Sequence, residues 1–492
     1  MCLFTNTEPN ETQCNMTTGH DIINPNPVMI VPFVVLLGAI AFCPLVIPRF
    51  WHKHYGKVAL SLGAISVAYY IFFLGAHERV WHTAHEYVSF ICLIGSLFVV
   101  SGGIHITVKG EATPWENVRL LLAGAIIANL LGTTGASMLL IRPWIRMNRY
   151  RIKPYHIVFF IFIVSNCGGC LTSIGDPPLF LGYLKGIPFF WVLLHCWHMW
   201  LIGVGALVGI FYVIDTLHYR KIPATIRAQE AEPPNVWKFE GLWNLLFLGV
   251  IIGAVFITKP PFLREAIMIT AATLSYVTTG RHIHHANHFN FHPIQEVAIL
   301  FAGIFATMMP ALDWLQLNAS QLGITSTTKL FWACGFLSSV LDNAPTYLSF
   351  LSAIMGSTVD QQIVHQVLSL AQSNNLHSID LSTYPESVRN TISAIQYYFG
   401  GKLQSGYLAV EQIEIAYLLG NPHSNIFIVA ISIAAVFFGA STYIGNGPNF
   451  MVKSIAEQQK IQMPTFMGYI IKYAIPYLLP VFFVIWILFF RD

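Results

Sequence analysis

Long apolar segments alternate with short polar stretches along most of the 492-residue chain. A bilayer core of about 30 Å takes roughly 20 residues of untilted helix, so apolar segments near this length predict membrane-spanning helices. The segments are 27–48, 58–75, 88–104, 120–141, 157–184, 190–214, 242–257, 266–279, 297–312, 330–354, 426–452 and 468–490. The pattern predicts an all-α polytopic membrane protein.

The composition agrees with this prediction and excludes several classes of function. The chain is 55% hydrophobic and 10% charged, whereas an ordinary soluble domain has about 25% charged residues. Its net charge of +3 gives no reason to expect a nucleic-acid partner. No HExxH, Walker or nucleophile-elbow motif is present, so we expect neither an enzyme nor a bound cofactor. The first 27 residues are polar and unlike a signal peptide, so the first span should remain uncleaved.

The segment 157–184 is unlike a continuous membrane helix. Its helix-breaking residues are Gly168, Gly169, Gly175, Pro177 and Pro178. Glycine releases the chain from helical geometry, and proline removes a backbone donor. Asp176 lies among them, and an acid at membrane depth points to a functional site. We therefore predict a broken helix that lines a site.

The same residue pattern returns 270 positions later. Gly169, Thr172, Ile174, Gly175, Pro178 and Phe180 correspond to Gly439, Thr442, Ile444, Gly445, Pro448 and Phe450. Asn446 takes the place of Asp176. Paired interrupted segments in two halves of a membrane protein are typical of a transporter's binding site.

Earlier in each half the offset is 210 residues. Glu86, Arg119, Leu120, Ala123 and Leu131 correspond to Glu296, Lys329, Leu330, Ala333 and Leu341. The offset grows because the second half carries an insertion, which the polar stretch 356–424 supplies. The predicted organisation is a polar segment 1–27, a first repeat 28–215, a cytoplasmic linker 216–241 and a second repeat 242–490, interrupted by an extracytoplasmic insertion 356–424.

Lysine and arginine placement predicts the topology. Basic residues crowd 49–57 and 142–153, and the positive-inside rule makes both segments cytoplasmic. The basic stretch before residue 120 must then also be inside, so 120–141 is predicted to be a re-entrant hairpin turning at 132–135. Its mate, 330–354, turns near Asp342 and Pro345. Five spans, one hairpin and one broken helix per half give two inverted repeats.

Two acids in these segments are the leading candidates for ion binding. Asp176 and Asp342 lie beside glycine, proline and amide side chains, without a lysine or arginine in their motifs. A mid-membrane acid costs about 2.5–3.5 kcal/mol on insertion scales, so a cation or a proton is its expected partner. Unwound carbonyls and hard oxygen ligands suit sodium. We predict that both aspartates bind sodium.

Each hairpin tip is expected to meet the broken helix of its own half. Thr133 and Thr134 would then face Asp176, and Asp342 would face Thr442 and Asn446. The other candidate ligands are Asn166, Thr172, Gly175, Asn343, Thr346, Gly445 and Asn449. Pro345 and Pro448 complete the expected helix breaks.

Two motifs carry a family resemblance. Ile174-Gly-Asp-Pro-Pro and Leu341-Asp-Asn-Ala-Pro-Thr resemble the paired motifs of the ion transporter superfamily, in the branch of sodium/proton antiporters, arsenite permeases and citrate-transporter-like proteins. The resemblance implies inverted repeats, re-entrant hairpins, midplane ion sites and often a homodimer. The tip Gly132-Thr-Thr-Gly departs from the Asp-Asn type, and the Ser-Asn-Thr signature of sodium-coupled dicarboxylate relatives is absent from both tips.

These observations lead to one main hypothesis and two alternatives. The main hypothesis is a secondary transporter that exchanges sodium for protons at Asp176 and Asp342. The first alternative couples a cation to the movement of citrate, a dicarboxylate or another anion, and the second is arsenite export. In each case the partners are the lipid bilayer and small inorganic ions or a small anion, and the expected location is a bacterial inner (plasma) membrane.

Further charged groups are expected at the ends of the spans. Glu86 and Glu296 occupy matched positions and are predicted to lie at water-exposed helix starts. Five histidines between His282 and His292 are predicted to lie in a solvated cytoplasmic loop, with pH sensing or metal binding as alternatives.

Overall fold

The computed structural model describes residues 23–109, 113–221, 236–257, 260–323, 326–372, 381–404 and 408–492. The chain folds into two compact units. The larger unit contains 22–357 and 426–492, and the smaller contains 358–425. Most of the predicted polar segment 1–27 lies outside the described residues.

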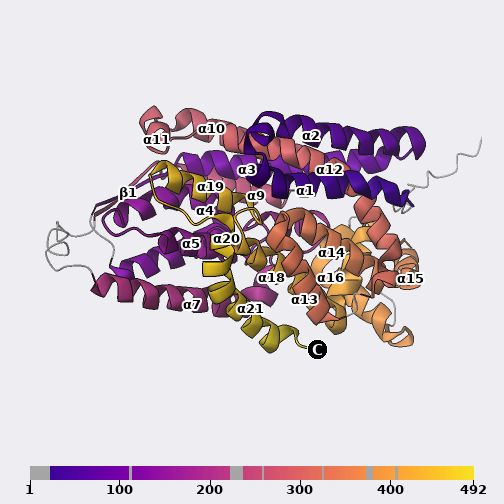
Figure 1. Cartoon of the computed structure of the whole chain (residues 1–492). Coiled ribbons are helices and arrows are strands. Elements are labelled where there is room, and N and C mark those ends of the chain that lie inside the picture. Colours follow the sequence, from indigo (N-terminus) through magenta and orange to yellow (C-terminus); the bar gives the residue numbers. More distant parts are fainter. Residues whose placement is uncertain are drawn as a thin grey trace, which may run out of the picture. The chain divides into compact units, whose positions relative to one another are not determined.

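Helices dominate both units, as the apolar pattern predicts (Figure 1). The first half contains η1 (Pro27–Ile30), α1 (Val31–Val46), α2 (Pro48–Ala68), η2 (Tyr69–Phe73), α3 (His77–Gly102), β1 (His105–Lys109), α4 (Pro114–Met147), α5 (Pro154–Ile163), η3 (Cys167–Gly169), α6 (Pro177–Leu184) and α7 (Trp191–Arg220). The second half contains β2 (Val236–Glu240), α9 (Asn244–Val255), α10 (Leu263–Thr278), α11 (Arg281–Ala286), α12 (His292–Asn318), η4 (Ala319–Leu322), α13 (Thr327–Val340), α14 (Asn343–Thr358), α18 (Pro422–Phe438), η6 (Gly439–Ser441), α19 (Gly447–Gln458), α20 (Phe466–Tyr469), η7 (Ile470–Leu478), α21 (Leu479–Ile485) and η8 (Trp486–Phe490).

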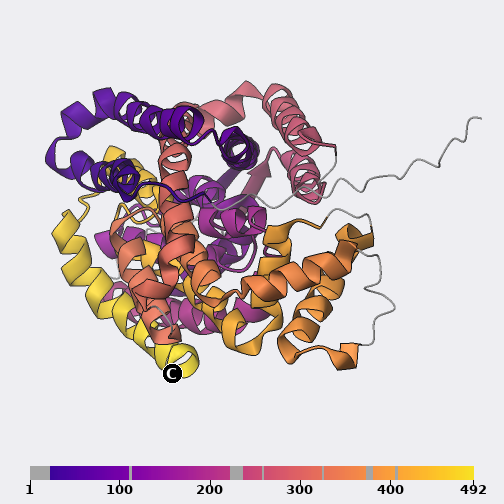
Figure 2. The ribbon, with the colours of Figure 1, turned by 90° about the vertical axis from the view of Figure 1, so that its right-hand side faces the viewer.

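Eight helices of the described chain are long and apolar enough to cross a membrane. Shorter apolar helices cover 154–169 and 244–255. The C-terminal helices, drawn in yellow, run along one edge of the larger unit (Figure 2). The protein is therefore a multi-pass membrane protein. The opposite orientation of its two halves stays a prediction.

The long helix α4 is a hairpin rather than a straight rod. Gly132 has φ +74° and ψ 158°, which interrupts the helix at its middle. The side chains of Asn117 and Asn148 exchange two hydrogen bonds of 2.9 Å, although 31 residues separate them. A straight helix would hold them about 46 Å apart at 1.5 Å per residue. The two arms therefore lie side by side, with the tip at Gly132.

The three other predicted breaks are present. Leu341 and Asp342 separate α13 from α14. Residues 164–176 interrupt the first broken helix, between α5 and α6, and residues 439–446 interrupt the second, between α18 and α19. Pro177 and Pro448 lie in the first turns of α6 and α19, where a missing backbone donor costs nothing.

The broken helices form the core of the larger unit. All residues from Tyr155 to Ile163 are buried, as are those from Ile428 to Phe438. A helix that is apolar on every side is stable only when other helices surround it. The interruptions of α5/α6 and α18/α19 are therefore held in the interior.

Two features differ from the predictions for span ends. Strands β1 and β2 form an antiparallel ribbon, with His105 paired to Glu240, although no strand was predicted. Glu86 was expected at a water-exposed helix start, but α3 begins nine residues earlier, at His77, and Glu86 is only 6% exposed. The helix extends through the polar residues before the apolar core, so that boundary was wrong.

The smaller unit contains α15 (Gln361–Gln372), η5 (Leu381–Thr383), α16 (Glu386–Gln404) and α17 (Val410–Gly420). Helix α15 buries Val364, Val367 and Ala371 along one face. Its first residue, Gln361, donates a 2.9 Å hydrogen bond to Glu414 of α17. The insertion therefore has a small core of its own.

Candidate ion and substrate site

The Asp176 carboxylate is the centre of a buried polar cluster. Its side chain is 1% exposed. Oδ1 accepts hydrogen bonds from Thr133 Oγ1 at 2.5 Å and Asn446 Nδ2 at 2.9 Å, and Oδ2 accepts one from Asn343 Nδ2 at 2.6 Å. The three donors are neutral. Thr133 comes from the first half and the two asparagines from the second, so both halves bind one carboxylate.

All four of these residues lie at the start of a helix. Thr133 opens the second arm of α4, Asn343 opens α14, and Asp176 and Asn446 are the N-caps of α6 and α19. A helix N-terminus carries about half a positive charge, so it attracts anions. The cluster is therefore a place where negative charge is stabilised without a basic side chain.

Matched hydrogen bonds in the two halves fix the four helix starts. The backbone amide of Thr133 donates to Gly175 O at 2.8 Å, and that of Asn343 donates to Gly445 O at 3.2 Å. These pairs correspond through the 210- and 270-residue offsets. The Thr172 hydroxyl donates to Asn129 O and the Thr442 hydroxyl to Ser339 O, each at 2.6 Å and in the same register. Residues that correspond in the sequence repeat therefore make corresponding hydrogen bonds in the two halves.

A second layer of amides supports the cluster. Asn446 Nδ2 also donates to Asn166 Oδ1 at 3.2 Å, and Asn166 Nδ2 donates to Asn449 Oδ1 at 2.6 Å. Asn449 in turn donates to the carbonyls of Gly439 and Thr442. This chain of amides joins the two broken helices across the halves.

Asp342 has other contacts than predicted. Its Oδ1 accepts a 3.0 Å hydrogen bond from the backbone of Ala344, so it caps the start of its own helix. The Thr442 hydroxyl is directed to Ser339 O, and Asn446 reaches Asp176. The expectation that each half pairs its own tip and break therefore holds for Thr133 with Asp176 and is wrong for Asp342.

The remaining predicted residues surround this centre. Thr346 donates to the carbonyl of Asp342, and Thr134 lines a cavity beside Asp176. Gly168 O accepts hydrogen bonds from Asn129 and Trp200. Gly169, Pro178 and Pro345 lie within the breaks or in the first turns that follow them.

A cavity of about 20 Å³ adjoins Asp176. The hairpin tip with Thr133, the break at Asp176 and the α3 residues Leu93 and Leu97 line it. One water molecule needs about 10–15 Å³ by this kind of measure, so the cavity has room for one water or one small ion. It is too small for an organic anion in this state.

One buried oxygen favours a cation in the cluster. Asn343 Oδ1 is buried, and no described residue donates to it. No group of three or more histidine, cysteine or acidic residues in the described ranges is placed to hold a metal. Sodium prefers hard carboxylate, amide and carbonyl oxygens, so the donor set here fits sodium better than a transition metal.

Gly175 within the first break and Gly447 at the start of α19 differ in the space around them. A Cβ on Gly175 would collide with the backbone carbonyl of Gly169, whereas one on Gly447 would meet nothing within 4 Å. We expect Gly175→Ala to displace the Asp176 break and remove transport. Gly447→Ala should retain both folding and transport. Equal uptake by the two variants in proteoliposomes would show that this close approach is unimportant.

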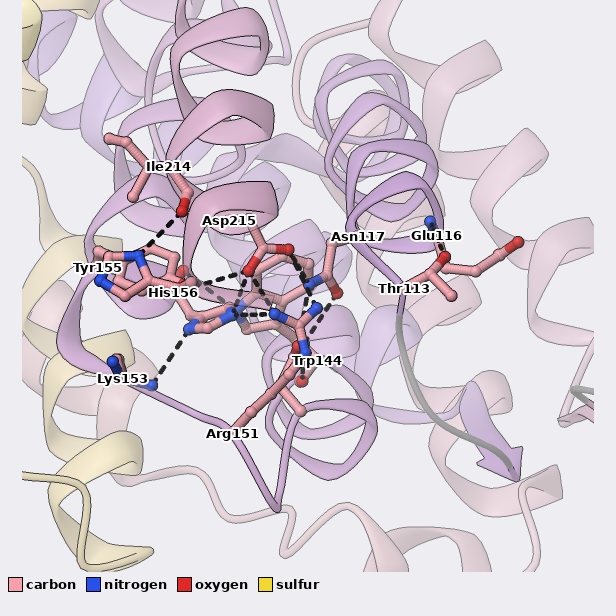
Figure 3. A network of polar contacts seen from close by, with 12 residues as sticks. Thr113, Glu116, Asn117, Trp144, Arg151, Lys153, Tyr155, His156, Ile214 and Asp215 are labelled. Carbon is pink, nitrogen blue, oxygen red and sulfur yellow. Dashed lines mark hydrogen bonds and ion pairs between the residues drawn. The ribbon is translucent and has the colours of Figure 1, made fainter. Parts of the chain in front are cut away.

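A second buried network fixes the open end of the α4 hairpin (Figure 3). Asp215 of α7 accepts hydrogen bonds from Tyr155 Oη at 2.7 Å and Asn117 Nδ2 at 2.9 Å. It also pairs with the Arg151 guanidinium, and His156 Nε2 lies 3.2 Å from its Oδ1. The network holds α4, α5 and α7 together. Sequence analysis missed it because these residues are widely spaced and Arg151 was considered only for topology.

Comparisons with known proteins agree with this architecture. A family model described as "Putative citrate transport" matches residues 24–490. A search of curated proteins found no match. The family match covers the α4 hairpin, the α13/α14 break, both broken helices and the Asp176 cluster. The chain therefore belongs to this citrate transport family, and this membership supports a secondary transporter.

Proposed function

We propose that the protein couples a cation bound at Asp176 to the movement of a small carboxylate anion such as citrate. The observation that supports this most is the convergence of four helix starts from both halves on one buried carboxylate. Because no basic side chain contacts Asp176, a cation or proton is the partner that can neutralise it. Asp342 caps its own helix and is the weaker candidate.

The anion part of the proposal rests on the helix N-termini and on the family. Anions gain favourable interactions at helix N-termini, so a substrate carboxylate is favoured near α6, α14 and α19 once a cation offsets the Asp176 charge. The bound cation would thus reduce the electrostatic repulsion between Asp176 and the incoming anion. This order of binding explains coupling without an arginine in the cluster.

Sodium/proton exchange without an organic substrate is the second candidate function. The cavity beside Asp176 supports it, because its volume of about 20 Å³ suits an ion or a water molecule. In that mechanism Asp176 alternates between a sodium-bound and a protonated state. Citrate would then neither be taken up nor alter the sodium flux.

Reconstitution in proteoliposomes distinguishes the two functions. We expect labelled citrate to accumulate under an inward sodium or proton gradient and to stop when the gradient is removed. Sodium-dependent proton flux in the absence of citrate would favour exchange instead. Citrate uptake that is independent of any cation gradient would contradict coupling through Asp176.

A further inference from the structure

The contact between α3 and α6 is arranged in layers above the Asp176 cavity. Glu86, Phe90, Leu93 and Leu97 are spaced by four, three and four residues, which places them on one face of α3. Leu93 and Leu97 line the cavity. Helix α6 has Asp176 as its N-cap and Lys185 as its C-cap, so it leads from the cavity to the far end of the same contact.

An aromatic layer closes this contact above the cavity. Phe90 and Phe180 stack with their ring centroids 6.4 Å apart, and Phe90 also stacks on Phe301 at 4.7 Å. Phe90 and Phe180 are at most 1% exposed. Phe180 also lines the cavity, so this layer lies directly next to it.

An ion pair forms the outermost layer. Lys185 Nζ lies 2.8 Å from Glu86 Oε1, and their side chains are 16% and 7% exposed. His82 Nδ1 lies 3.7 Å from the same carboxylate oxygen. The other nearby cation, Arg79, pairs with Asp313 at 2.8 Å. Lys185 is thus a partly accessible ammonium group held by a carboxylate, at the end that the predicted topology places outside.

We propose that the α3/α6 contact is the outer access route to Asp176, and that Lys185 is the first binding site for the substrate carboxylate, which replaces Glu86 there. This inference rests on the proposed citrate function. Glu86 occupies the position that an incoming carboxylate would take. Its displacement frees α6 to separate from α3, which opens the Phe90/Phe180 layer and enlarges the cavity.

The route is tested by thiol labelling, which requires no transport. Leu93→Cys, in a Cys92→Ala background, places a thiol on the cavity wall. A membrane-impermeant maleimide is added from the outside, and modification of the residue-93 peptide is followed by mass spectrometry. Glu86→Gln should increase the labelling rate several-fold, whereas Glu457→Gln, which removes the exposed partner of Lys453, should not. Unchanged labelling in Glu86→Gln would overturn the route.

Citrate uptake kinetics test the role of Lys185. Lys185→Ala should raise the KM for citrate about tenfold or more, with little change in the maximal rate. A factor of this size is the usual contribution of one charge-assisted hydrogen bond to binding. Lys185→Arg should stay close to wild type. The double variant Lys185→Ala/Glu86→Ala separates binding from structure. If the pair only stabilises the fold, removing both partners restores KM, and this result would overturn the assignment.

The two proposals can fail separately. Absence of citrate uptake by the wild type would refute the proposed function and the assignment of a carboxylate to Lys185. Faster labelling of Leu93→Cys in Glu86→Gln would still support the outer route in that case.

Discussion

Replacing Asp176 with asparagine is expected to reduce ion-coupled uptake about a hundredfold or more. The bound cation would lose its charge-assisted contacts with the carboxylate, and their binding free energy corresponds to a factor of about this size. The fold should persist. Asn446 occupies the matched position of the other break, so an amide is tolerated there. The amide of Asn343 can also turn over, because its Oδ1 has no described donor and can accept from the new Nδ2. The measurement is uptake by the purified Asp176→Asn variant in proteoliposomes. A melting temperature equal to that of the wild type shows that the variant is folded.

Asp342→Asn is the matched control for this variant. Asp342 accepts a backbone hydrogen bond from Ala344, and asparagine caps helices about as well as aspartate. We therefore expect this variant to retain most of the uptake. Equal losses in the two variants would mean that both aspartates bind the coupling cation, as the sequence alone predicted.

Asp215→Ala should lower stability more than any other change considered. It leaves the Arg151 guanidinium, which is 6% exposed, without its carboxylate and removes acceptors from Tyr155 and Asn117. Breaking a buried pair in this way costs about 3–5 kcal/mol. The melting temperature in detergent should fall clearly, and the hairpin base should become accessible to proteolysis.

The exposed ion pair at the start of α4 provides the comparison. Arg119 and Glu116 lie 2.7 Å apart, with side chains 61% and 22% exposed. Exposed pairs contribute about 0–1 kcal/mol, so Glu116→Ala should change the melting temperature little. Similar shifts for the two variants would show that the Asp215 network does not anchor the hairpin.

The helix breaks and the two-fold repeat could be predicted from the sequence because both depend on local chemistry. The glycines and prolines clustered between Gly168 and Pro178 disfavour a continuous helix there, and the offsets of 210 and 270 residues can be read from matched residues alone. The matched bonds of Thr133 to Gly175 and of Asn343 to Gly445 have these same offsets.

The arrangement around Asp176 could not be predicted in the same way. A repeat relates positions within each half, but it does not specify which side chains meet between the halves. Asn343 and Asn446 therefore reach Asp176, and Asp342 turns back to its own helix. The pair of Glu86 with Lys185 was missed for a similar reason, since 99 residues separate the two and only the packing of α3 on α6 brings them together.

Sodium binding measured by calorimetry tests the central role of Asp176 most directly. Sodium and protons compete for a carboxylate, so wild-type affinity for sodium should weaken as the pH falls. The Asp176→Asn variant should show no measurable sodium binding at any pH, whereas Asp342→Asn should follow the wild-type curve. Identical binding by the wild type and Asp176→Asn would contradict the assignment of the cation to Asp176.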